Sequence, residues 1–156
     1  MPIKKLKAFL DEYGVKYVSI QHSPAYTAAE VAESAHIPGL LLAKTVMVWI
    51  NDEMAMAVVP ASHRIDFDRL AEASGAVEVQ LASEDEFKEL FPTCDTGAMP
   101  PFGNLYGMRV IVESALTKDY EIAFTAGSHS EVIRLPYADF ERLVEPELAS
   151  FSQSVP

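Results

Sequence analysis

The stretch that decides the fold is residues 43–60, which read AKTVMVWI, then NDE, then MAMAVVP. Two apolar runs, Ala43–Ile50 and Met54–Pro60, flank the polar segment Asn51-Asp52-Glu53, and a short polar segment between two such runs is typical of a tight turn. Each run has the length of one strand and is apolar at most positions, not only at every second one. We therefore expect a β-hairpin whose strands are buried on both faces.

Helical and strand patterns alternate irregularly on both sides of this hairpin. Thr27 and Glu30 have the spacing of a capping box, which begins a helix, and Gly14 and Gly75 stand where helices would end. The same reasoning places helices over residues 3–13, 27–36, 66–74, 83–92 and 136–143, and strands over 15–20, 77–81, 109–113, 121–126 and 131–135.

This irregular order of elements favours an α+β (mixed α/β) domain over a doubly wound one. A length of 156 residues fits one domain, so residues 1–156 are expected to fold as a single unit. No glycine-rich loop joins a strand to a helix, and a nucleotide-binding Rossmann or P-loop protein is therefore not expected.

The sequence is strongly acidic, with 12 basic and 23 acidic residues and a net charge of −11. Non-specific affinity for a nucleic-acid backbone comes mostly from lysine and arginine, so this charge argues against a DNA-binding regulator. One or two well-placed cations would still be enough to bind the end of an RNA strand.

Three features predict a cytoplasmic protein that does not bind membranes. The longest apolar run, around Leu40–Ile50, is broken by Lys44 and falls short of the roughly 18 residues of a membrane span. The N-terminus lacks the apolar core and cleavage site of a signal peptide. The single cysteine, Cys94, excludes an internal disulfide and fits a reducing compartment.

Lys44 is the first candidate for chemistry, because it is a charged residue in an otherwise apolar segment. One interpretation is a lysine at a strand end whose ammonium reaches back to water. The other is a cation held rigidly at a cleft and directed at a phosphate or a developing oxyanion.

Two glycine-bearing turns are the other candidates. Gly97–Gly103 combines glycine with two prolines, and a stiff loop of this kind can bind a carbonyl or carboxyl oxygen through its N–H groups. Gly127 precedes Ser128 and His129 at the end of an expected strand, where the histidine could act as a base, a donor or a pocket wall. Each is equally compatible with a plain surface turn.

The remaining polar residues give weaker signals. His22-Ser23-Pro24 is typical of a turn, and nothing around Cys94 indicates a nucleophile with a partnered base. His22, His36, His63 and His129 show no metal-ligand spacing, so a zinc site is not expected. A glycine-flanked serine elbow is also missing.

Taken in order, these motifs resemble the YbaK-like domain, which is also found inserted in bacterial prolyl-tRNA synthetases. The resemblance runs from about Ile3 to Phe151, and the joint order and spacing of the motifs is specific although each is weak alone. The motifs are His22-Ser23-Pro24, Ala43-Lys44-Thr45-Val46, Gly97-Ala98-Met99-Pro100-Pro101 and Ala126-Gly127-Ser128-His129.

The resemblance implies a curved, barrel-like mixed sheet flanked by helices, and metal-independent hydrolysis of the ester between a mischarged amino acid and the terminal adenosine of tRNA. Lys44 matches the family lysine that contacts the terminal nucleotide, and His129 matches a histidine that shapes a small side-chain pocket. The expected catalytic residues are Lys44, Gly97, Ala98 and His129, and the expected substrate-binding residues are His22, Thr45, Met99, Pro100, Pro101, Gly127 and Ser128. No metal or other cofactor is expected.

Two departures from the family keep the removed amino acid open. Relatives that remove cysteine have another loop in place of Ser128-His129, and alanine-editing relatives often carry Asn where Thr45 stands. Alanine or serine is our expectation, because His129 and Met99 would leave a small cavity. The expected partners are the aminoacylated 3′ end of tRNA and a prolyl-, alanyl- or threonyl-tRNA synthetase, with a monomer as the default.

The expected mechanism needs little from side chains, because an aminoacyl ester is already activated. Water attacks the carbonyl, and an N–H group of Gly97, Ala98 or Gly127 stabilises the oxyanion. The ribose 2′-hydroxyl helps to orient the water, since no side chain is an obvious general base. The rival interpretations are a non-catalytic module that binds tRNA ends or a protein, and a small-molecule amidase or esterase that uses the same pocket.

Overall fold

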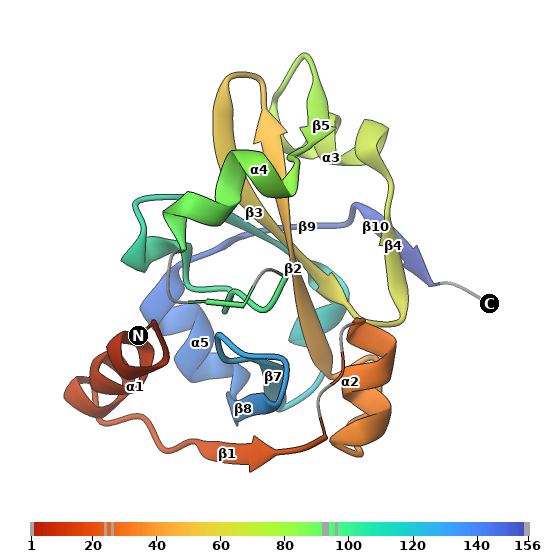
Figure 1. The fold of residues 1–156 in the computed structure, drawn as a ribbon. Coiled ribbons are helices and arrows are strands. Elements are labelled where there is room, and N and C mark those ends of the chain that lie inside the picture. Colours follow the sequence, from red (N-terminus) through yellow and green to blue (C-terminus); the bar gives the residue numbers. More distant parts are fainter. Residues whose placement is uncertain (1, 24, 26, 92–93, 96, 155–156) are drawn as a thin grey trace.

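The computed structural model describes residues 2–23, 25, 27–91, 94–95 and 97–154 (Figure 1). Its helices are α1 (Pro2–Glu12), α2 (Ala28–Ser34), α3 (Phe67–Ser74), α4 (Glu84–Phe87) and α5 (Tyr137–Val144), with 3-10 turns η1 (Lys88–Leu90), η2 (Gly103–Leu105) and η3 (Ser114–Thr117). Its strands are β1 (Val18–Gln21), β2 (Leu42–Ile50), β3 (Glu53–Pro60), β4 (His63–Ile65), β5 (Val79–Leu81), β6 (Arg109–Glu113), β7 (Glu121–Thr125), β8 (Glu131–Pro136), β9 (Glu147–Ala149) and β10 (Ser152–Ser154).

The predicted hairpin is confirmed and forms the centre of the fold. β2 and β3 pair antiparallel from Ala43 opposite Pro60 to Ile50 opposite Glu53. Asn51 closes the turn with a positive φ of 53°, a conformation that asparagine tolerates better than most residues. The long, twisted pair runs through the molecule in Figure 1, and β3 is buried from Ala55 onward.

The hairpin lies inside an 8-stranded mixed sheet with the order β1-β8-β7-β2-β3-β6-β9 and with β5 paired to β2. β2 runs parallel to β7, and β3 runs parallel to β6, while β7 and β8 are antiparallel. The predicted mixed α/β architecture is confirmed. Among the described strands the order ends at β1 and β9, so the curved sheet stays open and does not close into a barrel.

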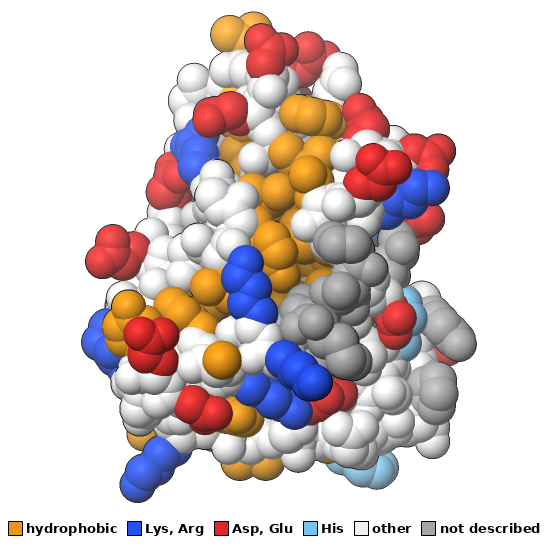
Figure 2. Space-filling view, turned by 60° about the vertical axis from the view of Figure 1, so that its left-hand side comes forward, with side chains coloured by type: hydrophobic (Ala, Val, Ile, Leu, Met, Phe, Trp, Pro, Cys, Tyr) orange, Lys and Arg blue, Asp and Glu red, His pale blue; other side chains and the backbone are white. Residues whose placement is uncertain are grey.

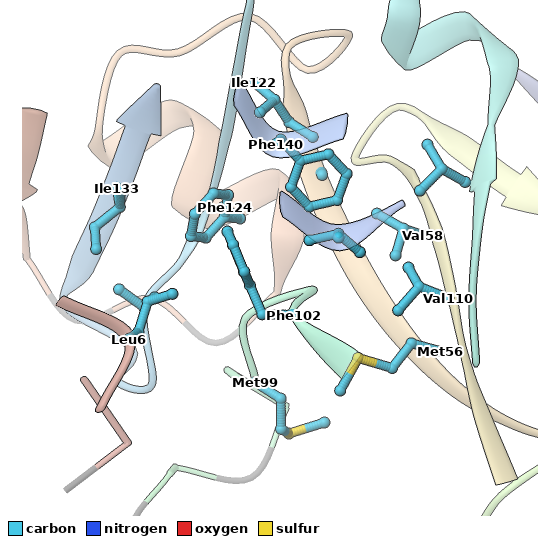
Figure 3. Packing of buried hydrophobic residues seen from close by; sticks show 14 of the residues in the cluster. Leu6, Met56, Val58, Met99, Phe102, Val110, Ile122, Phe124, Ile133 and Phe140 are labelled. Atoms are coloured by element: carbon cyan, nitrogen blue, oxygen red, sulfur yellow. The ribbon is translucent and has the colours of Figure 1, made fainter. Parts of the chain in front are cut away.

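The two faces of the sheet bury different apolar clusters, because side chains alternate along each strand. On one face, Met56, Val58, Val110 and Phe124 pack with residues of α1 and α5 in the largest cluster, part of which Figure 3 shows. The other face is covered in two places. α2 packs over Leu42, Ala123 and Val132, and Leu70 of α3 packs with Phe151 over residues of β2, β3 and β6.

Helix ends follow the expected signals. Thr27, Asp66 and Ser83 accept hydrogen bonds from backbone N–H groups in the first turns of α2, α3 and α4. Gly75 ends α3 in a left-handed conformation with φ 72°. These caps satisfy N–H groups that lack a partner inside the helix.

The structure differs from the sequence-based expectation in several short elements. The helix expected to reach residue 92 ends at Phe87 and tightens into η1, after which Phe91 is buried in the main cluster; residue 92 itself lies outside the described part. The strands β4, β9 and β10 were not expected. Each has only three residues, too few for a hydrophobic period to show.

Among the described residues no helix is long and apolar enough to cross a lipid bilayer.

Candidate active site

The candidate site begins where two parallel strands separate. β2 and β7 pair at only two positions, Leu42 opposite Ala123 and Ala43 opposite Phe124. Farther along, the same edge of β2 pairs with β5, starting at Val48. The stretch 44–46 therefore has β3 on one side and no described strand on the other.

A pocket of about 160 Å3 occupies this opening. Its walls come from four parts of the chain: the first turn of α2, the start of β2, the loop at Gly97, and the end of β7 with the turn that follows. The lining residues are Thr27, Val31, Leu42, Ala43, Lys44, Thr45, Val46, Gly97, Thr125 and His129. The structure thus brings Lys44 and Thr45 together with Gly97 and His129, although these three parts of the chain lie far apart in the sequence.

Lys44 is half-buried on the wall of this pocket, on the same face of β2 as Leu42 and Val46. Burial lowers the pKa of its ammonium below the usual value, and the positive charge of Arg64 lowers it further. Within the described chain no carboxylate forms an ion pair with Lys44. A partly desolvated cation with no protein counter-ion is well suited to bind an anion from outside.

Gly97 and His129 are neighbours on the pocket wall. Gly97 has φ +89°, in the region that side chains disfavour. A Cβ built on it would lie 3.9 Å from His129 Cε1, so the imidazole packs beside the glycine backbone.

The two turns are joined by backbone and side-chain hydrogen bonds. Asp95 N–H donates to Gly127 O at 2.8 Å, and Gly127 N–H donates to Ala98 O at 2.9 Å. The carboxylate of Asp95 accepts a bond from His129 N–H at 3.0 Å. Sequence reasoning missed Asp95, because its role depends on a turn more than 30 positions away that no local pattern reveals.

These bonds narrow the choice of oxyanion donor. Ala98 N–H is engaged with Asp95 O at 3.0 Å, and Gly127 N–H is engaged with Ala98 O. No described residue accepts a hydrogen bond from Gly97 N–H. Of the three donors expected from the sequence, Gly97 is therefore the one that lines the pocket and whose N–H group has no described acceptor, which leaves it to donate to an oxyanion.

The rest of the proline-containing loop lies in the core and not on the pocket wall. Ala98 and Met99 are at most 2 % exposed, and Pro100 and Pro101 are also buried. Figure 3 shows Met99 among the side chains of the main cluster. Their contact with the substrate stays a prediction; in the structure their apolar surface is removed from water by the core, which anchors the chain that follows Gly97.

His22 and Ser128 do not line the pocket, and both form hydrogen bonds with Ser130, the residue after His129. His22 N–H donates to Ser130 O at 2.9 Å, and its Nδ1 bonds Ser23 O at 2.7 Å. Ser128 Oγ accepts from Ser130 N–H at 3.3 Å, which closes the turn locally. Pro24, part of the same motif, lies outside the described residues.

Sequence reasoning also missed six lining residues, which are Thr27, Val31, Leu42, Ala43, Val46 and Thr125. Thr27 is predicted only as a helix cap, and Val31 and Thr125 lie within a predicted helix and a predicted strand that carry no signal for a pocket. Pocket membership follows from α2 lying over the sheet edge, which no signal within a single element reveals.

The described residues support neither a thiol nucleophile nor a metal centre. Burial raises the pKa of Cys94 to about 11, and Asp95 adds to this effect, so the thiolate is scarce near neutral pH. No group of three or more metal-ligating side chains was found in the described part of the chain.

Charge is unevenly distributed over the surface. On the face in Figure 2, acidic side chains are spread around the outline, while several basic ones gather near the lower end of a central apolar band. An overall charge of −11 therefore does not exclude a local cationic contact for a nucleic-acid end.

With the fold and the pocket established, comparison with known proteins gives the class. Residues 22–143 match the family described as the aminoacyl-tRNA editing domain. The chain belongs to this family. The predicted family is thereby confirmed.

Two relatives match along most of their length. The chain is 28% identical to the multifunctional Ser/Thr-tRNA deacylase ProXp-y of Escherichia coli (strain K12), over 97% of this chain and 93% of the relative. It is 27% identical to the prolyl-tRNA editing protein ProX of Acetoanaerobium sticklandii, over 88% and 87% of the two chains.

The fold has solved counterparts as well. A hypothetical protein of known crystal structure superposes with a TM-score of 0.85 at 20% identity, covering 96% of this chain and 99% of that one. This likeness confirms the mixed α/β fold.

Proposed function

We propose that this editing domain is a trans-acting deacylase, which hydrolyses the ester of a small amino acid wrongly attached to tRNA. The observation that carries the proposal is the single pocket that unites Lys44, Gly97 and His129. Support comes from the two relatives named for tRNA deacylation and editing, which the chain matches nearly end to end.

The size of the pocket suits the aminoacyl group and not the whole nucleotide. Its 160 Å3 is below the roughly 300–1,000 Å3 of pockets that enclose a drug-sized ligand. The amino acid and its ester would enter, while the terminal adenosine and the rest of the RNA stay at the mouth. Such contact with one end of the strand needs few cations, in keeping with the acidic composition.

Lys44 would bind the phosphate next to the terminal nucleotide. Its ammonium has no described carboxylate partner and sits at the pocket wall. A fixed cation there would hold the ester in one orientation relative to Gly97, which lowers the entropic cost of reaching the transition state.

Hydrolysis would proceed by attack of water on the ester carbonyl. The carbon–oxygen bond to the ribose breaks as the tetrahedral intermediate collapses, and the ribose oxygen leaves with a proton. Gly97 N–H would donate to the oxyanion, and one such donor contributes roughly 3–4 kcal/mol in other enzymes. The neighbouring ribose hydroxyl would orient the water, because none of the described lining residues is a carboxylate.

Selectivity would come from excluding larger side chains. Val31, Leu42 and Val46 make one part of the lining apolar, while the threonines at 27, 45 and 125 add hydroxyl groups. Serine and alanine fit such a lining, and the name of one relative includes serine and threonine. Prolyl-tRNA must survive, so proline should be rejected.

The location, domain extent, oligomeric state and docking partner of the protein belong to the same proposal. We place the protein in the cytoplasm, where charged tRNA is used, as one domain spanning residues 1–156 and as a monomer without a metal or cofactor. A synthetase that charges prolyl-, alanyl- or threonyl-tRNA is the candidate docking partner, and the match to a prolyl-tRNA editing protein favours the first.

The decisive experiment compares substrates that differ in how much RNA they carry. Seryl-tRNA, a seryl minihelix that ends in the same nucleotides, and serine methyl ester are incubated with the protein, and ester loss is compared with the spontaneous rate. The proposal expects rapid loss from both RNAs and little from the methyl ester. Equal activity on all three would indicate a small-molecule esterase, and binding without ester loss would indicate a non-catalytic module.

A further inference from the structure

Asp95 links the two turns that carry Gly97 and His129, although it does not line the pocket itself. Its backbone N–H bonds Gly127 O at 2.8 Å, and its backbone carbonyl accepts from Ala98 N–H at 3.0 Å. Its side chain accepts from His129 N–H at 3.0 Å. Asp95 thus bonds the backbone of Ala98, next to Gly97, and the backbone of Gly127 and His129 in the other turn.

The backbone of His129 is held by hydrogen bonds at both its N–H and its carbonyl group. Its carbonyl accepts from Ala25 N–H at 3.0 Å, and its N–H donates to the Asp95 carboxylate. The first bond is between backbone groups and survives any side-chain replacement. The second depends on a side chain, and a bond to a carboxylate is stronger than one between neutral groups.

Gly97 is held by the same residue from the other side. The bond from Ala98 N–H to Asp95 O closes a tight turn that contains Gly97, and Gly97 takes φ +89° within it. Its α-carbon faces the imidazole, with 3.9 Å between a built Cβ and His129 Cε1. The separation between the available N–H and the imidazole is therefore set through Asp95.

We propose that Asp95 is a positioning residue of the deacylation site, which fixes the oxyanion donor at Gly97 relative to the side-chain wall at His129. This inference rests on the proposed function of the pocket. It adds that rate and amino-acid selectivity are controlled together by one carboxylate that never touches the substrate.

The physical reason is that both functions depend on small distances. An N–H group stabilises an oxyanion only within hydrogen-bond range, and a displacement of about 1 Å can cost 10²-fold in rate. A wall that moves by a similar distance admits a larger side chain. Loss of the Asp95 carboxylate would release the His129 N–H, and the wall, with the ester seated against it, could then shift relative to the donor at Gly97, whose backbone bonds remain.

The test compares replacements that differ in their ability to accept a hydrogen bond. Asp95→Asn keeps a carbonyl oxygen that can accept from His129 N–H, whereas Asp95→Ala and Asp95→Leu do not. We expect the last two to lower kcat for seryl-tRNA by about 10- to 100-fold, with little change in KM, and to accept larger amino acids. Asp95→Asn should restore most of the rate and the selectivity.

Asp66→Ala is the matched control, because Asp66 also accepts a backbone N–H bond, from Arg69 at 3.1 Å, but at the start of α3. It should lower the melting temperature and leave the amino-acid preference unchanged. Folded Asp95→Ala and Asp95→Leu proteins with the wild-type rate and preference would overturn the proposal. So would an Asp66→Ala protein that shows the same loss of preference.

Amide hydrogen exchange separates this proposal from the proposed function. Asp95→Ala and Asp95→Leu should speed exchange at His129 N–H, and Asp95→Asn should not, whether or not the protein cleaves any ester. If the wild-type protein fails to deacylate tRNA, the proposed function fails. The exchange pattern still tests whether Asp95 holds the His129 N–H. Unchanged exchange in both non-accepting variants would overturn the role of Asp95 even in an active enzyme.

Discussion

Ala43 and Phe124 are the last residues at which β2 and β7 pair, and the residue that follows each of them lines the pocket. The next residues are Lys44 and Thr125, which both line the pocket. A parallel pair that separates after two positions leaves an opening in the sheet without a break in the surrounding core. β3 pairs with β2 along the whole stretch 44–46, so this part of the pocket wall belongs to a continuous hairpin.

Replacement of Lys44 by alanine should cut deacylation strongly and leave the protein folded. The lysine is half-buried on the pocket wall, and loss of its phosphate contact would misplace the ester, at a cost of about 10²-fold in kcat/KM. Deacylation of seryl-tRNA and the melting temperature are the measurements. Lys118→Ala, at an exposed lysine that does not line the pocket, is the control; equal activity of the two variants would remove Lys44 from the mechanism.

Substrate binding should weaken above a certain pH, here called the alkaline limit, because it depends on the positive charge of Lys44. Because burial and Arg64 lower its pKa, the ammonium loses its proton at a lower pH than an ordinary lysine, and phosphate binding weakens as pH rises through that value. Arg64→Gln removes a neighbouring positive charge, so the pKa of Lys44 should rise and the limit should move to higher pH. The measurement is the pH dependence of binding of a tRNA whose ester is replaced by a stable amide.

Arg69→Gln serves as the control for this shift, since Arg69 lies on α3 and is not among the causes of the lowered pKa. It should leave the alkaline limit in place. A limit that stays fixed in Arg64→Gln, or moves to lower pH, would contradict the proposed coupling.

Gly97→Ala should lower both stability and activity. Its φ of +89° is unfavourable for an L-residue, at a cost of about 1–2 kcal/mol. The added methyl would meet His129 Cε1 at 3.9 Å, an ordinary contact, so strain and not crowding sets the stability loss. Gly14→Ala, with φ +69° and nothing within 4 Å, should lose similar stability and keep full deacylation. Parallel denaturation and activity assays would show whether the two losses separate.

His129→Ala should broaden the range of accepted amino acids. The imidazole forms part of the pocket wall, and its removal enlarges the space for the side chain. The expected result is faster release of larger amino acids with a smaller effect on serine. His36→Asn, at an exposed histidine with φ 57°, is the control and should leave the range of accepted amino acids unchanged. An identical substrate profile for wild type and His129→Ala would contradict the role of His129 as the wall that limits side-chain size.

The sequence predicted the hairpin, the mixed fold and four of the residues that line the pocket, Lys44, Thr45, Gly97 and His129, because each has a local signal. Lys44 is a charge in an apolar strand, and Gly97 and Gly127 mark turns with positive φ. The roles of Asp95, Thr27 and Thr125 could not be predicted, since they arise from contacts between distant segments. Met99 packs in the core, and its sequence pattern does not distinguish this place from the pocket wall, because an apolar residue near a glycine turn can face either one.

The most direct measurement is deacylation of tRNA charged with serine, alanine, proline or phenylalanine, each compared with its spontaneous hydrolysis. A small pocket with one oxyanion donor predicts rapid loss of serine or alanine, with proline and phenylalanine retained. Loss of all four at similar rates, or of none, would contradict the account.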